Sequence, residues 1–133
     1  MTLEDKKLLI QDVMARLPYG TKFDLNGIRG SIHQTNIYTL YKGNDINNYI
    51  CSVDFFGDGN PIDIEHFKPC LLPLSSMTDE QYNEFTDMGY SVTERWWSMA
   101  NYHQIEWLNK NHFDYRGLIE KGLAINAADL NIY

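Results

Sequence analysis

The chain has 133 residues, a net charge of −7, 44% hydrophobic residues and 14% aromatic residues. A chain of this length and composition can bury a sizeable core in one domain, which argues against global disorder. The negative charge disfavours binding to the phosphate backbone of DNA or RNA.

The chain is expected to begin with a helix over residues 1–17. Thr2 can cap its first turn together with Asp5, and Pro18 ends it. Helical spacing predicts one buried apolar face, formed by Leu9, Ile10, Val13, Met14 and Leu17. Polar residues are expected to cover the rest of the helix: Lys6, Lys7, Asp12 and Arg16.

Residues 21–68 are predicted to form a β region. Alternating segments separated by turn residues predict five strands, over residues 21–25, 28–33, 36–41, 49–55 and 61–64. Asn26–Gly27 is a strong hairpin signal. Phe67 is expected in a single helical turn before an extended spacer over residues 69–73. Because short meanders usually curl, we predict a small antiparallel SH3-like barrel or a strongly bent sheet.

Residues 78–122 are predicted to be a helical region. Thr78 and Gln81 form a capping-box pattern for one helix, which Gly89 can end. The next helix is expected from Thr93 to Asn109, with one further turn over residues 118–121. No linker divides the chain, so the sequence predicts a single α+β domain over residues 1–133.

The N-terminus and the cysteines bear on the compartment. The first seven residues include four charged ones, at positions 4–7, and no apolar run approaches the ~18 residues of a membrane span. We therefore expect a cytoplasmic protein in which Cys51 and Cys70 are reduced and buried. No metal or cofactor is expected, because the chain has no zinc-ligand spacing, phosphate-binding loop or dinucleotide motif.

Aromatic residues are the predicted binding residues. Trp96 and Trp97 are adjacent, and adjacent residues on a helix point about 100° apart, so both are hard to bury in one small core. With Tyr90 and Tyr102 they form the predicted interface, because Trp and Tyr are enriched at binding hot spots. The alternative, that both tryptophans are buried between the helix and the barrel, is equally open.

The segment from Trp107 to Gly122 combines aromatic, acidic and basic side chains. His112, Asp114 and Arg116 alternate, so they would share one face of an extended segment. A structural role is favoured, in which Asp114 and Arg116 tie the segment to the barrel through charge-assisted hydrogen bonds. The alternative is a small hydrolase that uses His112 with Asp114, which requires His112 beside a cleft.

Three phrases in the sequence carry a resemblance to a known family: LPYG at 17–20, LLPLSSMT at 71–78, and the stretch from His112 to Ile125. The chain resembles a family of small uncharacterised proteins from phages, prophages and mobile elements of gut bacteria. The resemblance is weakest over residues 85–102. It implies a cytoplasmic accessory protein made inside a bacterial host, and it assigns no activity or functional residue. By analogy, the partner is expected to be a host or phage protein.

Three functions are compatible with the sequence. The favoured one is protein–protein binding without catalysis, for example by a phage-encoded inhibitor of a host or defence protein. No direct nucleic-acid or membrane binding is expected, and a homo-oligomer stays open. The first alternative is the small hydrolase. The second is an acidic mimic of nucleic acid, which requires a continuous acidic face, whereas the only tight acidic group is Asp54, Asp58, Asp63 and Glu65.

Overall fold

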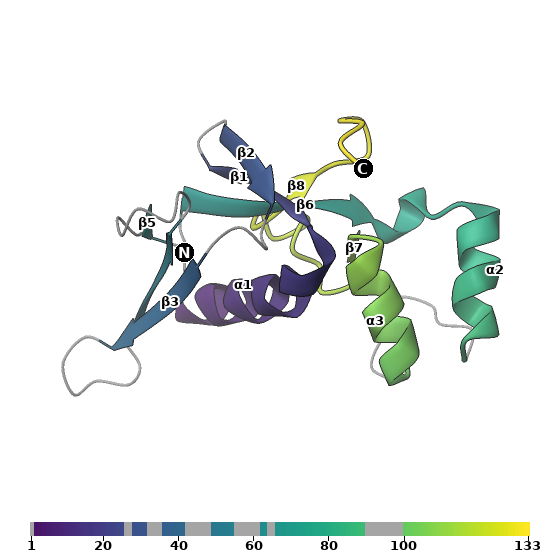
Figure 1. Cartoon of the computed structure of the whole chain (residues 1–133), viewed down its shortest axis with the longest axis horizontal. Helices are drawn as coiled ribbons and strands as arrows, with labels where there is room; N and C mark the ends of the chain where they lie inside the picture. The colour runs from purple at the N-terminus through teal and green to yellow at the C-terminus, as the bar shows by residue number, and fades with distance from the viewer. Residues whose placement is uncertain are drawn as a thin grey trace.

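The described part of the chain combines three helices with two open sheets (Figure 1). The computed structural model describes the backbone of residues 2–25, 28–31, 36–41, 49–54, 62–63, 66–89 and 100–133. It describes the side chains of residues 2–16, 18–24, 66–89 and 100–133. None of the helices in these ranges is long and apolar enough to cross a membrane.

Helix α1 spans Leu3–Arg16 and begins with the predicted cap. The Asp5 N–H donates to Thr2 Oγ1 at 3.1 Å, and the Thr2 N–H donates to Asp5 Oδ2 at 3.3 Å. A 3-10 turn, η1 (Leu17–Tyr19), follows α1 and contains Pro18. The cap at Thr2 therefore begins the helix and Pro18 follows its last residue by two positions, as the sequence predicted.

The buried face of α1 differs from the prediction. Three of the predicted apolar residues are buried: Leu9, Ile10 and Val13. Met14 is 56% exposed, so its assignment to the core is wrong. Asp12 and Arg16, expected at the surface, are fully buried. Their burial is possible because each charge has a partner inside the protein.

The larger sheet is mixed and is built around β6 (Phe67–Pro73). β1 (Lys22–Leu25) pairs antiparallel with both β2 (Ile28–Ser31) and β6. Two short strands, β7 (Phe113–Asp114) and β8 (Ile125–Asn126), pair in parallel with β6. The predicted helical turn at Phe67 is wrong, since a strand begins there.

The predicted SH3-like barrel is wrong for the described residues. β3 (Asn36–Tyr41), β4 (Tyr49–Asp54) and β5 (Ile62–Asp63) form a separate antiparallel sheet. The strands thus lie close to where the sequence placed them, but they are divided between two open sheets. The spacer expected after the β region is itself the strand β6, and its free edge pairs with β1. β1 and β2 therefore join β6 instead of closing a barrel with the other strands.

The remaining helices are both fixed by capping boxes. In α2 (Asp79–Asp87), Thr78 and Gln81 cap each other as predicted. In α3 (Tyr102–Lys110), Asn101 and Gln104 do the same. The expected start of this helix at Thr93 lies outside the described residues, as do residues 90–99 as a whole.

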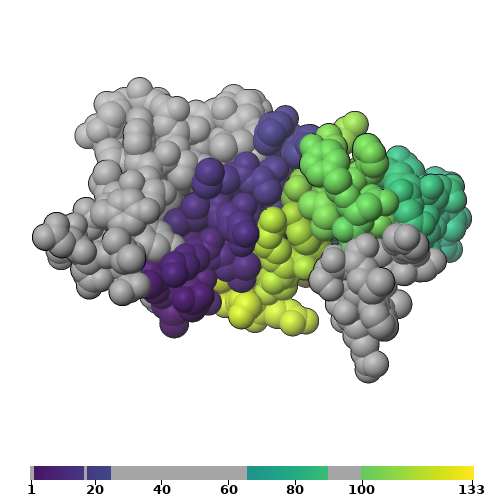
Figure 2. Space-filling view, turned by 90° about the horizontal axis from the view of Figure 1, so that it is seen from below, coloured from purple at the N-terminus to yellow at the C-terminus, as the bar shows by residue number. Residues whose placement is uncertain are grey.

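Two hydrophobic clusters form the core of the described residues. The first joins α1 to the larger sheet and the C-terminal segment: Leu9, Ile10, Val13, Phe23, Phe67, Leu71, Leu118, Leu123 and Ala124. The second joins α2, α3 and β7: Phe85, Trp107, Leu108 and Phe113. Cys70 is buried as predicted, and the side chain of Cys51 lies outside the described residues. Figure 2 shows α1, the C-terminal segment and α3 next to one another on one face.

Candidate functional site

A buried ion network joins α1 to β7 and the segment that follows it. Arg16 Nε donates to Asp12 Oδ2 at 2.9 Å, and Arg116 Nη1 donates to Asp12 Oδ1 at 2.7 Å. Arg16 Nη2 also donates to the carbonyl oxygen of Phe113 at 2.6 Å. Arg116 is the most accessible member, with its side chain 19% exposed. One carboxylate is therefore shared by two guanidinium groups, and it connects α1 to the segment that follows β7.

Tyr115 completes this network through its ring and its hydroxyl. The guanidinium carbons of Arg16 and Arg116 lie 5.4 Å and 4.5 Å from the centre of the ring. Both distances permit an attraction between the cation and the face of the ring. The Tyr115 hydroxyl donates to Asn109 Oδ1 of α3 at 2.8 Å. Arg16 Nη1 is buried and has no hydrogen-bond partner among the described residues.

The Asp114 side chain organises the loop between β7 and β8. Its Oδ1 accepts the Leu118 N–H at 3.0 Å, and its Oδ2 accepts the Ile119 N–H at 2.9 Å. Gly117 and Gly122 adopt φ angles of 74° and 73°, a region in which side chains other than glycine are strained. The loop is therefore a defined turn that Asp114 holds from within, and Asp114 does not make the predicted tie to a barrel.

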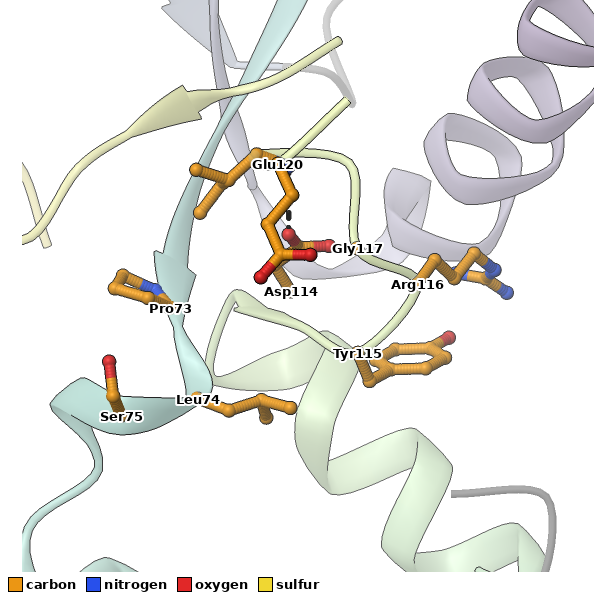
Figure 3. A pocket seen from close by; sticks show the side chains of 9 residues that line it. Pro73, Leu74, Ser75, Asp114, Tyr115, Arg116, Gly117 and Glu120 are labelled. Atoms are coloured by element: carbon orange, nitrogen blue, oxygen red, sulfur yellow. Dashed lines mark hydrogen bonds between the residues drawn. The ribbon is translucent and has the colours of Figure 1, made fainter. Parts of the chain in front are cut away.

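A hollow of about 350 Å³ opens beside this loop (Figure 3). Its lining residues come from the end of β6, from η4 (Leu74–Ser76) and from the loop: Pro73, Leu74, Ser75, Asp114, Tyr115, Arg116, Gly117, Ile119 and Glu120. Asp114 is only 7% exposed, whereas Glu120 is exposed. In Figure 3 the Glu120 side chain points back towards Asp114, and the Arg116 side chain points away from both.

His112 belongs to a different cluster. Its Nδ1 lies 2.8 Å from Thr21 Oγ1, and its ring stacks on the Tyr133 ring with 3.8 Å between centres. The Tyr133 hydroxyl donates to the Cys70 carbonyl at 2.7 Å and accepts the Lys22 N–H at 2.7 Å. Burial, reinforced by the charges of Arg16 and Lys22, lowers the pKa of His112 to about 4. His112 is therefore neutral at physiological pH.

Separate partners hold His112 and Asp114, the two residues of the hydrolase hypothesis. The imidazole contacts Thr21 and Tyr133, while the carboxylate accepts the N–H groups of Leu118 and Ile119. Among the residues lining the hollow, Asp114 is present and His112 is not. The hydrolase hypothesis stays a prediction without a shared site for its two residues.

The predicted interface is only partly described. Tyr90, Trp96 and Trp97 lie outside the described residues, as do the side chains of the acidic group from Asp54 to Glu65. Tyr102 is described and is 74% exposed at the first position of α3. Its ring lies 5.8 Å from that of His103 in an edge-on arrangement.

Glu106 follows Tyr102 by four residues on α3, so the two side chains lie on the same face of the helix. Desolvation, then the Glu106 carboxylate and to a smaller extent Tyr102, raise the pKa of the Tyr19 hydroxyl of η1. Tyr19 belongs to η1, and Tyr102, His103 and Glu106 belong to α3. We name this group the Tyr102 surface.

Some candidate residues were missed by sequence reasoning. Glu120 and Ser75 carry no recognisable motif, and only the fold brings them to one hollow. Tyr19 was treated as part of a turn. The pattern Asn101-x-x-Gln104 is a capping-box signal that could have placed the start of α3, and hence the exposed position of Tyr102.

No significant match was found when the chain was compared with models of protein families, with curated proteins and with solved structures. The resemblance to small proteins of phages and mobile elements therefore stays a prediction. In the described residues, no group of three or more His, Cys, Asp or Glu side chains could hold a metal ion.

Proposed function

We propose that the protein acts by binding another protein, and that the Tyr102 surface is part of the contact. The observation that carries this proposal is the 74% exposure of Tyr102. A tyrosine in that position adds almost nothing to the core, while its large, rigid and amphipathic ring can anchor a partner at little cost in side-chain entropy.

The Tyr102 surface is held by regular structure. The Gln104 N–H donates to Asn101 Oδ1 at 2.9 Å, and the Asn101 N–H donates to Gln104 Oε1 at 3.1 Å. These bonds fix the first turn of α3, from which Tyr102 projects. A surface on a rigid element loses little freedom on binding, so more of its contact energy is available for affinity.

The surface also has a mixed chemical character. Tyr102 and Tyr19 offer aromatic area, and Glu106 offers a carboxylate on the same face of α3 as Tyr102. Interfaces typically combine aromatic anchors with a polar rim. The predicted contribution of Trp96 and Trp97, and the expectation of a host or phage protein as partner, belong to the same proposal.

A photo-crosslinking amino acid placed at position 102 tests the proposal directly. In lysate of the host cell, we expect one dominant adduct from position 102. Position 14 serves as the matched control, because Met14 is also exposed but lies on α1 outside the Tyr102 surface. Adducts of the same identity and yield from both positions would show that the Tyr102 surface has no special role.

Affinity measurements with the captured partner provide the second test. If Tyr102 is a hot spot worth about 2 kcal/mol, Tyr102→Ser should weaken binding about thirtyfold. A chain with both Trp96→Ala and Trp97→Ala tests the part of the interface predicted from the sequence. Unchanged affinity in the folded Tyr102 variant would refute the proposal.

A further inference from the structure

The hollow beside β7 contains two carboxylates that are not neutralised by the described residues around them. Asp114 is 93% buried, since only 7% of its surface is exposed. Its bonds go to backbone N–H groups, which carry no net charge. Glu120 makes no hydrogen bond or ion pair within the described part of the chain, and its side chain points back towards Asp114 (Figure 3).

The one cation among the lining residues is committed elsewhere. Arg116 donates to Asp12 at 2.7 Å and lies over the Tyr115 ring at 4.5 Å. The Arg116 guanidinium therefore already has a buried carboxylate and an aromatic ring as partners, and in Figure 3 it points away from Glu120 and Asp114. The hollow therefore presents net negative charge to an incoming group.

The walls of the hollow suit an aliphatic stem that carries a charged end. Pro73, Leu74 and Ile119 supply apolar side chains. Each oxygen of the Asp114 carboxylate accepts one N–H and keeps acceptor capacity for a second donor. Lysine and arginine side chains have this composition, because they pack their methylene groups on apolar surface and present a charged head.

We propose that the hollow binds a lysine or arginine side chain of a protein partner, with the cationic head between Glu120 and Asp114. This inference rests on the proposed function, because it treats the occupant as part of a protein. The described residues contain no group of three or more His, Cys, Asp or Glu side chains that could hold a metal ion, so the proposed occupant is an organic cation.

The test is a titration followed by the amide NMR signals of the ¹⁵N-labelled full chain. The probe is the blocked tripeptide Ala-Arg-Ala, and the matched control is the same peptide with citrulline, which keeps the shape of arginine and lacks the charge. The N–H groups of Leu118 and Ile119 are the reporters, because they donate to the Asp114 carboxylate.

We expect saturable shifts of both reporters with the arginine peptide, at a dissociation constant of about 1 mM, and no saturable shift with citrulline. Glu120→Gln should weaken binding about three- to fivefold. Asp87→Asn removes the same charge at an exposed position at the far end of α2 and should leave the constant unchanged. Both substitutions are at exposed positions, so neither should perturb the fold.

Equal shifts with both peptides, equal effects of the two substitutions, or no saturable shift would each overturn the proposal. The titration needs no partner, so its failure is distinct from failure of the proposed function. If the hollow rejects arginine while position 102 still crosslinks, the partner uses the Tyr102 surface without the hollow. If the hollow binds arginine and position 102 does not crosslink, this inference stands and the Tyr102 surface is wrong.

Discussion

Asp12→Asn is expected to be among the most destabilising single substitutions in α1. The Asp12 carboxylate is fully buried and is the shared partner of Arg16, at 2.9 Å, and Arg116, at 2.7 Å. An amide of the same size cannot neutralise either cation, so a buried charge is left without compensation. Such a change costs about 3–5 kcal/mol. That is a large part of the ~5–15 kcal/mol that stabilises a typical domain.

Urea unfolding measures this loss. With a slope of about 1.5–2 kcal/mol per molar urea, the midpoint should fall by about 2 M. Glu4→Gln is the control, because Glu4 pairs with Lys7 at 3.8 Å on the surface of the same helix. Breaking an exposed pair of this kind costs less than about 1 kcal/mol. The comparison separates the effect of burial from the loss of one negative charge.

A second substitution tests the cause of the loss. Adding Arg116→Met to Asp12→Asn removes one of the two cations left without a counter-charge, so about 1–2 kcal/mol should be recovered. The reasoning fails if Asp12→Asn loses less than about 1 kcal/mol. It also fails if the effects of the two substitutions simply add, because the network would then carry no coupling between α1 and the segment after β7.

Three further predictions concern other parts of the described chain. Because of His112, the free energy of unfolding should fall as the pH drops from about 6.5 to about 4, since the unfolded chain then binds a proton that the folded chain excludes. After allowance for solvent screening, urea unfolding should show a loss of about 1–2 kcal/mol over this range. Asp114→Ala should speed hydrogen exchange at the Leu118 and Ile119 amides before other core amides, because it removes their acceptors. Gly89→Ala should lower the thermal midpoint, because the new methyl carbon would overlap the Asn101 side chain, which caps α3.

Two of these predictions have a matched comparison. His112→Asn removes the titrating ring, and asparagine tolerates the positive φ of 65° at this position, so its unfolding should lose the pH dependence. Asp129→Ala, at an exposed position, should leave hydrogen exchange at the Asp114 loop unchanged. The argument for Asp114 would be contradicted by unaltered hydrogen exchange in Asp114→Ala. The argument for His112 would be contradicted if the stability of His112→Asn still depended on pH in this range. The argument for Gly89 would be contradicted by an unchanged thermal midpoint in Gly89→Ala.

Much of the secondary structure followed from the sequence, whereas the pairing of the strands did not. The strand at Asn36–Tyr41 and the capping box of Thr78 with Gln81 are as predicted. The barrel prediction was wrong because the alternating pattern of five segments does not indicate which strands pair. β6 pairs with β1, β7 and β8, which lie more than 40 residues away from it along the chain.

The candidate sites show the same division. A structural role for Asp114 was predicted as a tie to the barrel, whereas its carboxylate accepts two N–H groups of its own loop. The partner of Arg116 was not predicted, since it is the helix residue Asp12 and not a residue of a barrel. Glu120 was not singled out, because a lone exposed carboxylate becomes a candidate binding residue only when the structure shows that it lines a hollow.

The sequence by itself determined the features that depend on residues a few positions apart. The cap of Thr2 with Asp5 and the turn at Pro18 are of this kind, since the groups that make them are neighbours in every conformation of the chain. Only the tertiary structure decided that Asp12 and Arg16 are buried. A charge leaves water only where a partner compensates it, and Arg116 is 104 residues away from Asp12. Helical periodicity along α1 carries no information about that partner.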